Sequence, residues 1–171
     1  MTNSGLERGA ATMAGFAQNP KHVVLCGSMT FYGEMLRLQD RLHEGFVRTV
    51  LPDAEDERVA ALATAEVERF KRRVSLAHMR RVRHRSTFGI LALNLDKRGV
   101  TDYIGPSTFA EIAMATAFSK RVYLLGGYPE FYADELAAWG VVALDGRLDR
   151  LIEDYWVTCL PGPQLTMFAH T

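Results

Sequence analysis

Short apolar segments alternate with longer segments of helical periodicity along most of the chain. The apolar segments are rich in Val, Leu and Ile and cover residues 22–27, 47–51, 87–94, 121–126 and 141–144. Such alternation is typical of a parallel sheet whose strands are joined by crossover helices. The pattern therefore predicts an α/β fold with five parallel strands, of which 87–94, almost entirely apolar, is the central one.

The segments between these strands have the spacing of helices. Between residues 31 and 46, the apolar residues Met35, Leu38, Leu42 and Phe46 recur at steps of three and four, which places them on one helical face. Further helices are predicted at 106–118, 129–139 and 148–157, and the long polar segment 55–82 predicts one interrupted helix or two.

Right-handed crossovers between five strands favour a single doubly wound sheet of flavodoxin/Rossmann-like order 2-1-3-4-5. In such sheets, ligands bind beyond the carboxyl ends of the strands. The residues expected at those ends are small and polar: Gly27 with Ser28, Pro52 with Asp53, residues 94–105, and Gly126 with Gly127. We therefore expect the functional site at this edge of the sheet.

Length and composition fit one such domain. The chain has 171 residues, 48% of them hydrophobic, which is enough to bury a core without disulfides or structural metal. We assign residues 21–160 to the domain, 1–20 to a flexible leader and 161–171 to a C-terminal tail. The two cysteines, Cys26 and Cys159, have no metal-ligand spacing, so we expect a reducing, cytoplasmic compartment and no zinc site.

The charge balance argues against macromolecular partners held by electrostatics. Lys plus Arg equals Asp plus Glu, so the formal net charge is zero, and no general attraction to nucleic acid or to an anionic membrane is expected. The basic cluster within 69–85 follows an acidic patch within 53–57, which predicts mutual screening rather than nucleic-acid binding. Charges or glycines interrupt every apolar run, so we expect no membrane span.

The strongest candidate for chemistry lies in LNLDKRGVTDYIGPSTFAEIAMATA, residues 93–117. Glu111 is flanked there by small apolar residues suited to packing against a sheet. If Pro106 begins the helix, Glu111 lies in its second turn and Ser107 one turn earlier on the same face. Ser107, Thr108 and free backbone N–H groups at the helix start would then offer donors to an anion such as phosphate.

This stretch, together with VVLCGSMTF at 23–31, resembles the nucleoside 2-deoxyribosyltransferase-like superfamily, which includes nucleotide N-glycosidases. The resemblance covers most of the chain after His22. It implies that Glu111 attacks the anomeric carbon of a nucleoside or nucleoside 5′-monophosphate and expels the base, after which water or a second base completes the cycle. It also implies a homodimer or higher homo-oligomer that needs no cofactor.

Four further residues bear on how the base is handled. Asp96 and Asp102 are the candidates to protonate or hold the departing base. Asn94 and Gly105 stand where the deoxyribosyltransferases have aspartates. Because an amide cannot deliver a proton as a carboxylic acid does, these departures argue against base exchange more than against glycoside cleavage.

The early turn completes the expected site. Gly27 and Ser28, followed by a helix, resemble an anion-holding turn, although the segment lacks the glycine patterns of dinucleotide and ATP sites. The resemblance suggests that Phe31 or Tyr32 stacks on the base or orients Glu111. Cys26 is interpreted as a small buried hydrophobe.

Several alternatives remain open at this point. Glu111 could be a structural carboxylate that caps a helix or pairs with an arginine. The chain could be a nucleotide-sensing module without turnover, or a phosphoribohydrolase of the cytokinin-activating type, whose glutamate motif the TxxE within GPSTFAE resembles without the paired glycines. The pKa of Glu111 matters as well, because burial would raise it, the helix start would lower it, and a nucleophile needs the second effect to prevail.

Overall fold

The computed structural model describes residues 21–53 and 64–159. The predicted leader 1–20 and tail 161–171 lie outside the described residues, as do residues 55–63 of the predicted segment 55–82. The sheet has five parallel strands in the order β2-β1-β3-β4-β5, which confirms the predicted doubly wound topology. The strands are β1 (His22–Gly27), β2 (Thr49–Val50), β3 (Thr87–Leu93), β4 (Arg121–Leu124) and β5 (Val142–Ala143).

The helices fall where the periodicity predicted them, with ends that differ by one or two residues in α2, α4 and α6. They are α2 (Tyr32–Glu44), α3 (Thr64–Arg83), α4 (Pro106–Ala117), α5 (Ala133–Ala138) and α6 (Asp149–Cys159), with short 3-10 turns η1 (Met29–Phe31) and η3 (Glu130–Tyr132). The predicted helix 129–139 is thus divided into η3 and α5. Helix α4 begins at Pro106, as predicted, with Gly105 as its N-cap.

Helices cover both faces of the sheet, and alternate side chains of each strand point to opposite faces. On β1, Val23 and Leu25 pack into the core formed with α2 and α6, whereas Val24 and Cys26 pack into the core formed with α3, α4 and α5. Every residue of β3 is buried, as expected for a central strand covered on both faces.

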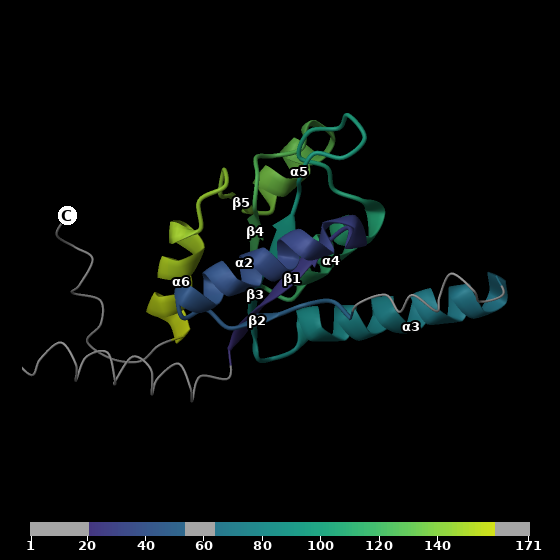
Figure 1. Ribbon diagram of the computed structural model, residues 1–171. Coiled ribbons are helices and arrows are strands. Elements are labelled where there is room, and N and C mark those ends of the chain that lie inside the picture. The colour runs from purple at the N-terminus through teal and green to yellow at the C-terminus, as the bar shows by residue number, and fades with distance from the viewer. Residues whose placement is uncertain (1–20, 54–63, 160–171) are drawn as a thin grey trace, which may run out of the picture.

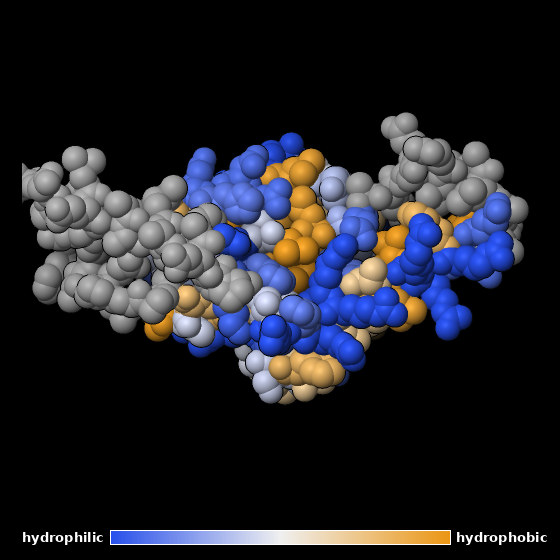
Figure 2. All heavy atoms as spheres, turned by 90° about the horizontal axis from the view of Figure 1, so that it is seen from below, coloured by the Kyte–Doolittle hydropathy of each residue, from blue (hydrophilic) through white to orange (hydrophobic). Residues whose placement is uncertain are grey.

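Helix α3 packs against α4 at its C-terminal end, while its first turns extend beyond the sheet (Figure 1). Its exposed side chains include Arg72, Arg73 and Leu76, and hydrophilic and hydrophobic side chains lie side by side on the face seen in Figure 2. Arg81 pairs with Asp53 at 2.7 Å, one instance of the expected screening. Among residues 21–53 and 64–159, no helix is both long and apolar enough to cross a bilayer.

Candidate functional site

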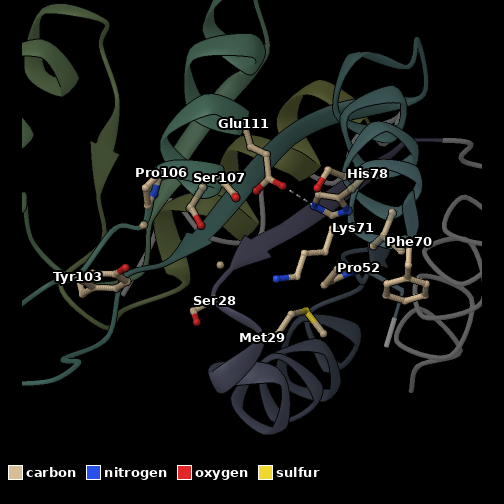
Figure 3. A pocket seen from close by; sticks show the side chains of 15 residues that line it. Ser28, Met29, Pro52, Phe70, Lys71, His78, Tyr103, Pro106, Ser107 and Glu111 are labelled. Carbon is tan, nitrogen blue, oxygen red and sulfur yellow. Dashed lines mark ion pairs between the residues drawn. The ribbon is translucent and has the colours of Figure 1, made fainter. Parts of the chain in front are cut away.

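A cleft of about 510 Å³ lies beyond the carboxyl end of β1, between the middle of α3 and the start of α4 (Figure 3). This is the edge of the sheet at which the topology predicts a ligand. Four segments line the cleft: the end of β1 with η1, Pro52 after β2, the middle of α3, and the first turns of α4 with the residues that lead into them. The lining residues that the sequence predicted are Gly27, Ser28, Gly105, Ser107, Thr108 and Glu111.

Helix α4 directs the carboxylate of Glu111 into this cleft, where it points toward the ring of His78 on α3 (Figure 3). Glu111 Oε1 lies 3.7 Å from His78 Nε2, and the two side chains are only 12% and 4% exposed. Glu111 lies in the second turn of α4, as predicted. Its carboxylate neither faces bulk solvent nor pairs with an arginine among the described residues.

Burial controls the ionisation of both groups. Burial raises the pKa of Glu111 to about 7, although a hydrogen bond with the Cys26 thiol opposes the rise. Burial, followed by the nearby charge of Arg81, lowers the pKa of His78 to about 4. A nucleophile was expected to need a lowered pKa, but in this cleft the effect of burial prevails. At neutral pH, His78 is therefore neutral and Glu111 is only partly ionised.

Cys26 completes a cluster with these two residues. Its Sγ lies 3.5 Å from His78 Nε2, and the sulfur, the imidazole nitrogen and a carboxylate oxygen of Glu111 all lie within 4.8 Å of one another. Cys26 is fully buried, as predicted, and burial, with the nearby carboxyl of Glu111, raises its pKa well above the usual value. Such a set of thiol, imidazole and carboxylate could hold a divalent metal ion.

The sequence alone assigns His78 a surface or capping role, because it has no metal-ligand spacing. This prediction is wrong, because the residue is 3% exposed and lies within α3. No motif links it to Cys26 or Glu111, since the three belong to α3, β1 and α4. The signal available in the sequence was its spacing. His78 lies four residues from both Val74 and Val82, and that repeat places all three on one helical face.

The start of α4 and the nearby turn at Ser28 offer donors to an anion. The α4 start leaves the backbone N–H groups of Ser107 and Thr108 without carbonyl partners inside the helix, and Gly105, its N-cap, provides no side-chain cap. Ser28 Oγ accepts a hydrogen bond from Lys97 Nζ at 2.6 Å, and Lys71 lines the cleft from α3. These cations and the positive end of α4 make this region suitable for phosphate.

Asn94 and Asp102 lie elsewhere, at the junction between the ends of β3 and β4. Asn94 Oδ1 accepts the N–H of Gly126 at 2.8 Å, and its Nδ2 donates to the carbonyl of Gly127 at 2.7 Å and to Asp102 Oδ1 at 3.3 Å. The same Asp102 oxygen accepts the N–H of Gly127 at 3.0 Å. Neither side chain is among the residues lining the cleft, and both hold two strand ends together.

Three other candidates also lie away from the cleft. Asp96 is exposed, and its Oδ1 accepts the N–H of Asp102 at 3.1 Å. Phe31 is 8% exposed and belongs to the core beneath α2, against which Tyr32 packs. The aromatic rings that do line the cleft are those of Phe70 and Tyr103, which the sequence analysis did not select.

Comparisons of the chain with protein-family models, with curated proteins and with solved structures found no match. The superfamily resemblance therefore stays a prediction, as do the homo-oligomeric state and the cytoplasmic location that accompany it. What bears on function is the arrangement of side chains around the cleft.

Proposed function

We propose that this protein cleaves the N-glycosidic bond of a nucleoside or nucleoside 5′-monophosphate, with the carboxylate of Glu111 as the nucleophile. The observation that carries this proposal is the position of Glu111, whose carboxylate lies in a cleft at the ligand-binding edge of the sheet. The cleft volume of about 510 Å³ falls within the range typical of small-molecule sites.

In the proposed reaction, a Glu111 oxygen attacks the anomeric carbon of the sugar. The bond from that carbon to the base nitrogen breaks, and its electron pair leaves with the base, which takes up a proton from solvent. Water attacks the same carbon of the glycosyl ester, gives up one proton to solvent, and releases the sugar together with the free carboxylate. Only the ionised form of Glu111 can begin this sequence.

The anion-binding end of the cleft favours a substrate that carries a phosphate. The N–H groups of Ser107 and Thr108 and the ammonium groups of Lys71 and Lys97 could hold a 5′-phosphate. Phosphate bound there would fix the sugar relative to Glu111, one helical turn away. We therefore expect nucleoside 5′-monophosphates to be better substrates than the corresponding nucleosides.

Replacing the nucleophile tests the proposal directly. Glu111→Gln should abolish base release from a panel of nucleosides and 5′-monophosphates, because the amide cannot attack the anomeric carbon. Its ligand affinity should remain within about tenfold of the wild type, or ~1.4 kcal/mol. Base release is followed by chromatography and affinity by calorimetry, each with and without a second base, so that hydrolysis is distinguished from exchange.

The matched control is Glu135→Gln, which makes the same change at an exposed position of α5. It should retain full activity. Turnover by Glu111→Gln at the wild-type rate would show that Glu111 is not the nucleophile.

The second candidate function is a nucleotide-sensing module that binds without turnover. The observation that favours it is the burial of Glu111, which raises its pKa to about 7 and so keeps part of the carboxyl protonated at neutral pH. Saturable binding of a nucleotide by the wild type, with no base released from any member of the panel, would support this function over the enzymatic one.

A further inference from the structure

Cys26, His78 and Glu111 bring three different ligand atoms close together beside the cleft. They come from β1, α3 and α4, so the absence of metal-ligand spacing in the sequence does not bear on their arrangement. The thiol sulfur, the imidazole Nε2 and a carboxylate oxygen lie within 4.8 Å of one another. Two of these side chains, His78 and Glu111, also line the cleft itself (Figure 3).

The spacing of the sulfur and the nitrogen matches the needs of a tetrahedral zinc ion. With a Zn–S distance of about 2.3 Å and a Zn–N distance of about 2.0 Å, tetrahedral geometry holds sulfur and nitrogen about 3.5 Å apart, and Cys26 Sγ and His78 Nε2 are 3.5 Å apart. His78 Nε2 and Glu111 Oε1 are 3.7 Å apart, so the carboxylate would have to move closer to the ring, to roughly 3.3 Å, to share the ion. The cleft leaves room for a fourth ligand, as in zinc sites with three protein ligands.

Hydrogen bonds account for only part of the cluster. The Cys26 thiol bonds to the Glu111 carboxyl and lies within bonding distance of His78 Nε2. The 3.7 Å between His78 Nε2 and Glu111 Oε1 is longer than a hydrogen bond. A cation placed among the three atoms would contact all three groups at once.

We propose that Cys26, His78 and Glu111 form a binding site for Zn²⁺ or another thiophilic divalent cation. Binding of the cation requires no particular activity of the protein. A consequence that does rest on the proposed function is inhibition: a cation that holds the Glu111 carboxylate withdraws it from attack on the sugar. The site would then regulate base release by competition for the nucleophile.

Cobalt titration of the metal-free full-length chain tests the site independently of activity. Co²⁺ bound through a thiolate gives a sulfur-to-cobalt charge-transfer absorption, so the wild type should develop this band and reach saturation at one equivalent. Cys26→Ser should lose the band. The chain has two cysteines, and the matched control Cys159→Ser, which alters the cysteine of α6, should retain it.

Zinc affinity provides a second measurement that does not depend on the spectrum. In competition with a chromophoric chelator, Glu111→Gln should raise the Kd for Zn²⁺ by at least about tenfold, because one ligand is lost. Thermal melting of each metal-free variant checks its fold. If Cys26→Ser does not fold, Glu111→Gln and Cys159→Ser still decide between binding at the cluster and binding elsewhere.

Absence of the charge-transfer band in the wild type, its persistence in Cys26→Ser, or an unchanged Zn²⁺ affinity in Glu111→Gln would each overturn the site. The two proposals fail separately. Cobalt binding by a protein that releases no base would refute the proposed function and support the cation site. Base release by a protein that binds no Co²⁺ or Zn²⁺ would support the proposed function and refute the cation site.

Discussion

Burial shifts the pKa values of Glu111 and His78 in opposite directions. The pKa of Glu111 rises from 4.5 to about 7, and the pKa of His78 falls from 6.5 to about 4. Both groups therefore favour their neutral forms in the cleft. Two buried neutral groups cost less to desolvate than two separated charges. This explains how a carboxyl and an imidazole can lie 3.7 Å apart with little access to water.

The activity should therefore rise with pH. Because only the ionised carboxylate of Glu111 can attack, kcat/KM for base release should increase through about pH 7 and reach a plateau above it. The measurement is a pH–rate profile of the wild type in the presence of a chelator. A rate that falls as pH rises through this range would indicate that Glu111 acts as an acid instead.

The same pKa values predict how stability depends on pH. Between pH 4.5 and 7 the folded state holds a proton on Glu111 that the unfolded state has released, so this group makes unfolding easier as pH rises. His78 does the opposite between pH 4 and 6.5, where the unfolded state binds the extra proton. Over most of this range the two contributions oppose each other.

Glu111→Gln should remove the contribution of Glu111 to the pH dependence of stability and leave that of His78. Relative to the wild type, the free energy of unfolding of the variant should increase from pH 4.5 to 7.5, by at most about 3 kcal/mol for a shift from 4.5 to about 7. Urea unfolding of both proteins, in chelator, at several pH values measures the difference. A difference that does not change with pH would mean that Glu111 titrates normally in the folded protein.

At the scale of elements, hydrogen bonds of Asn94 connect the end of β3 to the loop that follows β4. Its side-chain oxygen accepts the N–H of Gly126, and its side-chain nitrogen donates to the carbonyl of Gly127. A side chain on Gly126 would overlap Asp102 Oδ1, so this junction also depends on a glycine. Asn94 thus has a structural role that explains why an amide is present at this position.

Asn94→Ala should lower the free energy of unfolding by about 2–4 kcal/mol, because it removes hydrogen bonds from a side chain that is 1% exposed and leaves backbone groups unpaired. Chemical denaturation measures the loss, with Thr101→Ala, an exposed change in the same loop, as the control. Wild-type stability of this variant, combined with an altered preference for the base, would instead indicate that Asn94 contacts the substrate.

At the scale of the whole molecule, the sequence predicted all five strands and their order, although β2, β3, β4 and β5 are shorter than predicted, and it predicted the site in part. Strand order followed from alternation and handedness, and the strand-end rule placed Glu111, Ser107 and Ser28 at the cleft. Asp96 and Asp102 were predicted from their type and proximity in the loop, but their carboxylates bond to nearby backbone instead. The bond of Asp96 stays within its own loop, where such capture of polar side chains is common, whereas the bond of Asp102 reaches Gly127, 25 positions away in the sequence.

His78 could not be placed by a motif, because its contacts depend on how α3 packs against α4. Its ring meets Cys26 across 52 positions of sequence. Periodicity shows that such a residue faces inward, yet it does not say which residues of other elements it meets. That information depends on helix packing, which a single sequence does not contain.

The alternation along β1 makes the cluster sensitive to insertions and deletions. Adjacent residues of a strand point to opposite faces of the sheet. An insertion or deletion of one residue in the first half of β1 would therefore turn Cys26 toward α2 and bring an aliphatic neighbour into its place. Such an indel could leave strand pairing and hydrophobic content nearly unchanged. The thiol would nevertheless be on the wrong side of the sheet from Glu111, and a homologue with that indel would keep the fold without the cluster.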